Sequence, residues 1–143
     1  MTNCILLIED DEDDALLITD AFKAVGVSGA FRHVKDGEEA VNYFQGTGPY
    51  ANRDLHPVPS LVLLDLQLPK MSGVDVLKWM RTQPNLKTVI VIILTGVPLD
   101  VEIQRAYLLG ANSLLVKDAT QEQLNKTIRV LKEYWLDRNQ TAR

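Results

Sequence analysis

The sequence has little of what several large classes of protein depend on. Its single cysteine, Cys4, excludes an intramolecular disulfide and suits a reducing compartment, so we expect a cytoplasmic protein. No apolar stretch approaches the roughly 20 residues of a membrane-spanning helix, and acidic residues directly after the first apolar run argue against a secretory leader. The formal net charge of -4 argues against nucleic-acid binding, which needs a basic face. Aromatic residues make up only 6%, so the core must be mainly aliphatic.

Short apolar runs are what the sequence does contain. Five of them stand out, at residues 4–8, 30–34, 61–64, 89–94 and 113–116. Three read ILLI, LVLL and VIVIIL, and are continuous rather than alternating. Continuous runs of this length are typical of strands that are buried on both faces, as in a parallel sheet.

Segments with a helical period separate these runs. We predict helices over residues 14–25, 37–44, 74–80, 99–109 and 121–136. In the first, the spacing places Leu17 and Ala21 on the inner face. Gly26 and Gly110 are expected to cap the first and fourth helices at their ends, and Thr120 to cap the start of the last.

The alternation of strand and helix predicts one α/β domain over residues 1–143, with an ordered core from about 4 to 136 and no output domain. Right-handed crossovers then give an open, doubly wound parallel sheet with helices on both faces. Residues 46–60 interrupt the rhythm with Gly, Pro and Asn, and read as a long surface loop without an assigned role.

Reactive side chains follow four of the five predicted strands. Glu9 and Asp10 come after the first, Asp65 after the third, Thr95 after the fourth and Lys117 after the fifth. Ligands of open α/β sheets bind beyond the carboxyl ends of the strands, so we expect these groups at one edge. Each residue alone could be an ordinary strand-end, turn or surface residue, and residues 11–14 are interpreted as the acidic start of a helix. The prediction of a site depends on all of these residues sharing one edge of the sheet.

The combination has a chemical logic. Crowded carboxylates repel one another unless a cation intervenes, and oxygen ligands suit Mg²⁺, for which Mn²⁺ can substitute. A carboxylate such as Asp65 can act as a nucleophile toward phosphorus. Lys117 and Thr95 could then stabilise the charge on the phosphoryl oxygens.

Four motifs, ILLIEDD, LLDLQLPKMSG, ILTG and LLVKD, follow one another in this order. In these motifs the sequence resembles the response-regulator receiver domains of two-component signalling. The resemblance implies a flavodoxin-like receiver fold with strand order 2-1-3-4-5. It also implies that a histidine kinase phosphorylates Asp65, that Thr95 contacts the phosphoryl group, and that Lys117 pairs with its oxygens.

The metal ligands are likewise implied by the resemblance. Asp10 is expected to bind Mg²⁺ directly and Glu9 through water. Asp65 and the backbone carbonyl of Gln67 would complete the protein ligands.

Within the family, the long loop at 46–60 and the segment RAYLLGAN resemble the single-domain regulators paired with bacterial phytochromes. That resemblance implies a phytochrome kinase as partner and a homodimer through the fourth and fifth helices, with Tyr134 and Trp135 at the contact. The alternative is that Trp135 only packs the last helix onto the sheet.

Three departures from the family pattern stand out. Asp118 replaces the proline that usually follows the lysine, which disfavours a cis peptide bond. Leu114 stands where many members carry an aromatic switch residue. Gly96 leaves room beside the phosphorylation site and Val97 cannot position an attacking water, so we predict slow loss of the phosphoryl group.

The function predicted first is a stand-alone receiver that signals through protein partners and catalyses only its own phosphorylation and dephosphorylation. The alternative is a receiver-like interaction module that is never phosphorylated. A phosphatase with an aspartyl nucleophile is disfavoured, because Gln67 stands where such enzymes place a second aspartate. His33 and His56 have no cluster around them, and we expect neither to donate phosphoryl groups or bind metal.

Overall fold

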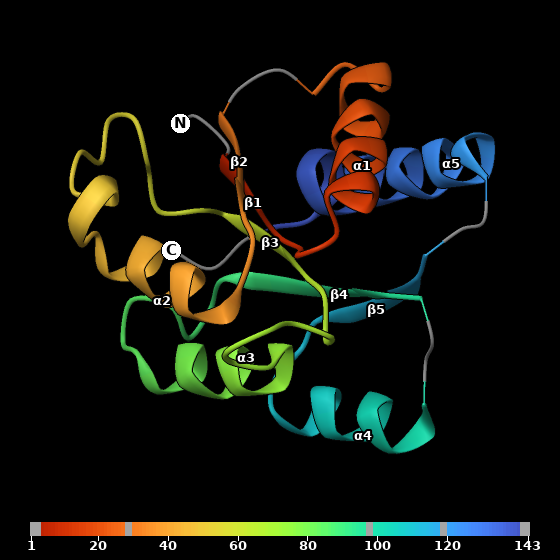
Figure 1. Ribbon diagram of the computed structural model, residues 1–143. Helices are drawn as coiled ribbons and strands as arrows, with labels where there is room; N and C mark the ends of the chain where they lie inside the picture. Colours follow the sequence, from red (N-terminus) through yellow and green to blue (C-terminus); the bar gives the residue numbers. More distant parts are fainter. Residues whose placement is uncertain (1–3, 28–29, 97–98, 118–119, 141–143) are drawn as a thin grey trace.

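The computed structural model describes residues 4–27, 30–96, 99–117 and 120–140. Within them, five parallel strands form one sheet in the order β2-β1-β3-β4-β5 (Figure 1). The strands are β1 (Cys4–Ile8), β2 (Ala30–Val34), β3 (Leu61–Leu64), β4 (Ile90–Thr95) and β5 (Ser113–Val116). This confirms the predicted fold class and strand order.

Five α-helices of the described residues cover the two faces of the sheet. They are α1 (Glu12–Ala24), α2 (Gly37–Gln45), α3 (Gly73–Thr82), α4 (Asp100–Leu108) and α5 (Gln121–Leu131). The helices α1 and α5 lie on one face, and α2, α3 and α4 on the other (Figure 1). The last helix continues as a π-helical segment over Lys132–Arg138, which covers the rest of its predicted length.

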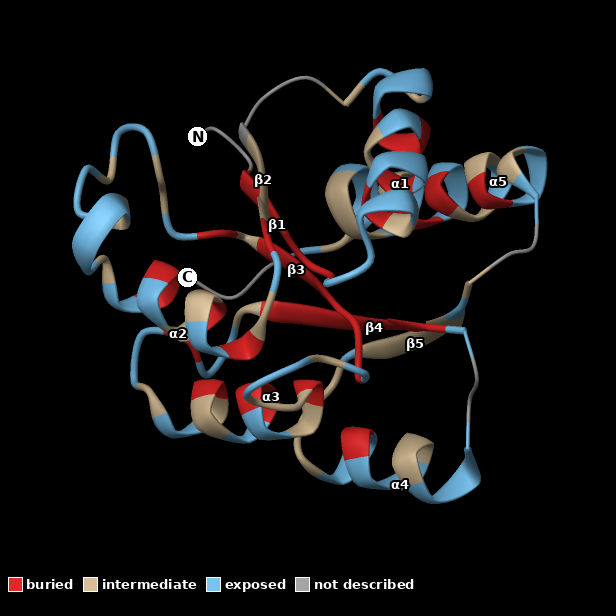
Figure 2. Cartoon of the chain, viewed as in Figure 1, coloured by how far each residue is buried: buried red, intermediate tan, exposed pale blue. Residues whose placement is uncertain are grey.

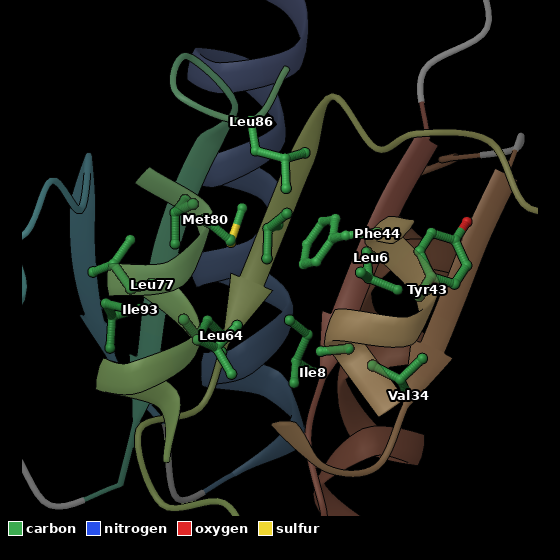
Figure 3. Close-up of a cluster of buried hydrophobic side chains, with 14 of the residues drawn as sticks. Leu6, Ile8, Val34, Tyr43, Phe44, Leu64, Leu77, Met80, Leu86 and Ile93 are labelled. Carbon is green, nitrogen blue, oxygen red and sulfur yellow. The ribbon is translucent and has the colours of Figure 1, made fainter. Parts of the chain in front are cut away.

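Each strand of the sheet centre supplies side chains to two cores. Along β1, Leu6 and Ile8 pack toward α2 and α3 (Figure 3), whereas Ile5 and Leu7 pack toward α1 and α5. This alternation is the two-residue period of a strand. All of β1, β3 and β4 is buried (Figure 2), which explains why these strands read as unbroken apolar runs in the sequence.

The inner face of α1 differs from the prediction. The buried residues are Ala15, Ile18, Ala21 and Phe22, whereas Leu17 is 41% exposed. Ile18 and Phe22 are one helical turn apart and fill the space against the sheet, so the helix is rotated by about one residue from the predicted orientation. The prediction for Leu17 was therefore wrong.

The predicted helix caps are confirmed. Gly26 and Gly110 have φ angles of 80° and 105°, a region that favours glycine. Thr120 accepts a hydrogen bond from the backbone N–H of Gln123 at 3.2 Å through its hydroxyl, and so caps α5.

The segment between α2 and β3 lies on the surface but is anchored to the fold. Within this segment, the guanidinium of Arg53 donates to the backbone carbonyls of Tyr43 (2.7 Å), Phe44 (2.6 Å) and His56 (3.1 Å). The buried hydroxyl of Tyr43 donates to the carbonyl of Pro57 at 2.8 Å. These bonds hold the segment in one conformation with almost no regular structure of its own.

A second arginine ties together the amino-terminal end of the sheet. Arg81 of α3 donates to the carbonyls of Leu86 and Val89, each at 2.9 Å, and to Gly110 at 2.6 Å. It therefore joins the connection before β4 to the turn between α4 and β5.

In the described segments, no helix is long and apolar enough to cross a bilayer.

Candidate functional site

An open depression of about 530 Å³ lies at the carboxyl edge of the sheet. It is formed by the ends of β1, β3, β4 and β5 together with the starts of α1 and α4. All of the side chains that were predicted to share one edge line this depression. The topology brings them together because parallel strands end on the same side of the sheet.

Asp65 lies at the centre, immediately after β3, and is only 6% exposed. One carboxylate oxygen accepts a hydrogen bond from the backbone N–H of Gln67 at 2.9 Å, and the other lies 3.0 Å from Lys117 Nζ. The start of α3 passes so close that a Cβ on Gly73 would overlap the carbonyl oxygen of Asp65. Glycine is therefore required there, which gives a physical reason for the Ser72–Gly73 end of the central motif.

Glu9 and Asp10 add two more carboxylates. Ligand atoms from Glu9, Asp10 and Asp65 lie within 4.8 Å of one another, a spacing that a single cation can span. Glu9 is buried, whereas Asp10 is exposed. Burial raises the pKa of Glu9 to about 8; nearby Asp65 also raises it, and Lys117 lowers it.

Lys117 is the cation of the site. Its ammonium contacts three carboxylates, those of Glu9, Asp14 (2.9 Å) and Asp65 (3.0 Å). Burial acts to lower the pKa of Lys117, but the three acidic partners outweigh it and raise the pKa above its ordinary value. The lysine is thus held charged at neutral pH.

Thr95 ends β4 beneath the depression and is 1% exposed. Its hydroxyl has no hydrogen-bond partner among the residues that the structure describes, although its carbonyl accepts from the backbone N–H of Lys117 at 2.8 Å. Among the described residues, a Cβ on Gly96 would meet only the side chain of Lys117, at 3.9 Å, so this part of the chain leaves room beside the site. The departures at Val97 and Asp118 lie outside the described residues.

Two contacts of the site were missed by sequence reasoning. Asp14, interpreted as part of an acidic helix start, contacts Lys117. His33 donates from Nε2 to the carbonyl of Glu9 at 2.7 Å, so it supports the site without lining it. A helical side chain leans toward the helix amino terminus, and this could have indicated that Asp14 points at the sheet edge.

The rim of the depression includes α4. The side-chain amide of Gln67 donates to Glu102 Oε2 at 3.3 Å, which joins the β3–α3 connection to α4. Leu114 of β5 is partly buried against the core. His56 packs edge-on against the rings of Tyr43 and Tyr50, and it does not line this depression.

Comparison with known proteins identifies relatives over almost the whole chain. A family model described as the response regulator receiver domain matches residues 5–129. The chain is 36% identical over 140 residues to the probable methanogenesis regulatory protein FilR2 of Methanothrix harundinacea. The matched region covers 96% of this chain and 86% of that protein. It is 32% identical over 133 residues to the response regulator Rcp1 of Synechocystis, covering 93% and 88%.

Solved structures agree. The phosphorylated cyanobacterial phytochrome response regulator RcpA has a TM-score of 0.91 at 33% identity, with all of both chains covered. The Mn²⁺-bound form of Rcp1 has a TM-score of 0.88 at 30% identity, with 99% of each covered. The chain is thus similar in sequence and in structure to phytochrome response regulators.

Proposed function

The chain belongs to the response regulator receiver domain family, and on that premise we propose that it accepts a phosphoryl group on Asp65 from a sensor histidine kinase. The observation that carries the proposal is the buried carboxylate of Asp65 facing Lys117 at 3.0 Å. Receiver domains are signalling modules rather than enzymes with a substrate of their own. Output through protein contacts, from a stand-alone domain in the cytoplasm, is part of this proposal.

The transfer step follows from the positions of the side chains. A carboxylate oxygen of Asp65 forms a bond to phosphorus as the bond from phosphorus to the donor's imidazole nitrogen breaks. The electron pair of that bond stays on the nitrogen, and a ring protonated on its other nitrogen leaves as neutral imidazole. Lys117 would donate to the phosphoryl oxygens from one side, and the buried hydroxyl of Thr95 from below.

The acidic cluster suits a hard divalent cation. Glu9, Asp10 and Asp65 offer three carboxylate oxygens within 4.8 Å, the donor type that Mg²⁺ and Mn²⁺ take. A bound cation would offset the charge of these carboxylates and of the incoming phosphoryl group. The Mn²⁺-bound form of Rcp1 supports this choice. We assign Glu9, Asp10, Asp65 and the carbonyl of Gln67 as the protein ligands.

The phosphoryl group would shift the domain between two conformers. Thr95 ends the strand beside β5, and Gln67 contacts Glu102 on α4, so both connect the site to the α4–β5 surface. Because Leu114 is aliphatic, the shift would proceed without an aromatic side chain at that position. Phosphorylation then acts by favouring one of two pre-existing states.

The partners proposed are a phytochrome-type kinase and a second copy of the chain. The similarity to RcpA and Rcp1 supports the first. The homodimer was expected through α4 and α5, and an apolar groove of about 750 Å³ between β5 and α5 supports the α5 part of that contact. Its lining includes Leu115, Val130, Tyr134 and Trp135 but no residue of α4. Tyr134 is 54% exposed and could meet a partner, whereas Trp135 packs partly against the core.

Intact-mass measurement after incubation with acetyl phosphate tests the proposal. We expect a phosphoryl adduct that requires Mg²⁺, is absent in Asp65→Asn and is retained in Asp54→Asn, a matched change in the exposed part of the α2–β3 segment. Failure of acetyl phosphate and of a panel of histidine kinases, including a phytochrome, would leave the non-phosphorylated interaction module as the better function.

A further inference from the structure

The ammonium of Lys117 has one partner to which the proposed reaction gives no role. An ammonium carries three N–H donors, and the structure provides three acidic side chains for them: Glu9, Asp14 and Asp65. We propose that Asp14 is a positioning residue, which holds the Lys117 ammonium at the phosphoryl site throughout the phosphorylation cycle. This inference rests on the proposed function and deepens it.

The backbone of Asp14 is held in place by the capped first turn of α1. It lies in the first turn of α1, where its backbone N–H donates at 2.9 Å to the capping side chain of Asp11. Lys117, by contrast, follows the edge strand β5 and has a long, flexible side chain. The contact spans 103 residues of sequence and ties the end of β5 to α1. Asp14 thus adds a third contact, from α1, to the two that Glu9 and Asp65 make with the Lys117 ammonium.

The other two partners of Lys117 have competing tasks. Glu9 and Asp65 belong to the carboxylate cluster that fits a cation, and Asp65 is also the proposed phosphoryl acceptor. Asp14 is outside that cluster. When Glu9 and Asp65 face the cation and Asp65 carries the phosphoryl group, Asp14 remains as the acceptor for one N–H of Lys117. The other two N–H groups are then free to point at phosphoryl oxygens.

This arrangement predicts a specific kinetic effect. Without Asp14, Lys117 still carries its charge, but its side chain samples several rotamers once Glu9 and Asp65 are engaged with the cation and the phosphoryl group. Misplacement of a catalytic group by about 1 Å can cost on the order of 100-fold in rate, and partial loss of restraint should cost roughly tenfold. Removal of one negative charge at the rim should not weaken binding of an anionic donor. The rate at saturation should therefore fall, while the half-saturating concentration of acetyl phosphate stays equal or falls.

The kinetic test measures phosphorylation by acetyl phosphate at saturating Mg²⁺ in three variants. We expect Asp14→Ala to lower the saturating rate about tenfold. Asp14→Asn keeps an oxygen that can accept from Lys117, and should recover most of that loss. Asp13→Ala removes the same charge from the same helical turn, at an exposed position that does not line the depression, and should match the wild type.

Equal losses in Asp14→Ala and Asp13→Ala would overturn the inference, because the charge of the helix start alone would explain them. A wild-type rate in a folded Asp14→Ala protein would overturn it as well. If the alanine variant does not fold, the asparagine variant decides: its rate must exceed that of Lys117→Ala by several fold.

A second measurement needs no phosphorylation. Nitrogen-15 NMR of the lysine ammonium groups in the unphosphorylated protein at saturating Mg²⁺, where Glu9 and Asp65 would face the cation, reports the mobility of Lys117 Nζ, with Lys117→Arg identifying its signal. We expect a restrained ammonium in the wild type and in Asp13→Ala, and a mobile one in Asp14→Ala. If the wild type takes up no phosphoryl group, the proposed function fails, and this measurement alone decides whether Asp14 restrains Lys117.

Discussion

The buried carboxyl of Glu9 predicts how the affinity for Mg²⁺ should change with pH. Its pKa is raised from the ordinary 4.5 to about 8, chiefly by burial and then by the neighbouring Asp65, while Lys117 works in the opposite direction. At neutral pH and without metal, Glu9 is therefore mostly protonated. A cation in the cluster requires the ionised form, so binding must displace that proton.

The size of the effect follows from the titration of one group. With a pKa of about 8, the ionised fraction of Glu9 is roughly 3% at pH 6.5 and roughly 75% at pH 8.5. The affinity for Mg²⁺ should therefore rise about 25-fold between these two pH values and level off above them. The sign is fixed: raising the pH removes the competing proton and strengthens binding.

Isothermal titration calorimetry can measure both the affinity and the proton. Repeating the titration at pH 7 in buffers of different ionisation enthalpy should reveal close to one proton released per Mg²⁺ bound. Glu9→Gln is the matched control, because it has the same shape and no titrating carboxyl; its affinity should be nearly independent of pH. A wild-type affinity that is flat from pH 6.5 to 8.5, with no proton release, would refute the reasoning.

Three further predictions concern packing and assembly. Arg81→Ala should lower the free energy of unfolding by about 3 kcal/mol, because four carbonyls lose a charged donor. In urea titrations Lys78→Ala, an exposed change on the same helix, should shift the free energy of unfolding by less than about 0.5 kcal/mol. Gly73→Ala should slow labelling by acetyl phosphate and destabilise the fold by about 2 kcal/mol or more, since its Cβ overlaps the backbone of Asp65; a wild-type labelling rate would contradict the proposed close approach. Val130→Glu should weaken the proposed homodimer in sedimentation experiments, and an unchanged dissociation constant would exclude the β5–α5 groove as its contact.

Much of the fold was predictable because the strands are buried on both faces. A strand with this environment needs apolar residues throughout, so its run in the sequence coincides with its extent in space. The fourth strand runs from Ile90 to Thr95, one residue later than predicted at both ends. The same logic located the site, since Asp65 and Lys117 directly follow strands whose ends share an edge.

What could not be predicted depends on contacts that periodicity does not encode. The inner face of α1 was misplaced because Leu16 and Leu17 are apolar and yet exposed, so hydrophobic spacing alone could not fix the rotation of the helix. The partnership of Asp14 with Lys117 joins residues 103 positions apart. Arg81 binds backbone carbonyls, which every residue carries, so its partners leave no mark in the sequence.

The anchored segment between α2 and β3 has a consequence for how such a protein can evolve. Arg53 holds it through three main-chain carbonyls, and its guanidinium also lies over the ring of Tyr43. Leu55 and Val58 project from it into solvent, at the opposite end of β3 from Asp65. Substitutions at Leu55 and Val58 should therefore change the exposed surface of this segment without reaching the proposed phosphoryl site.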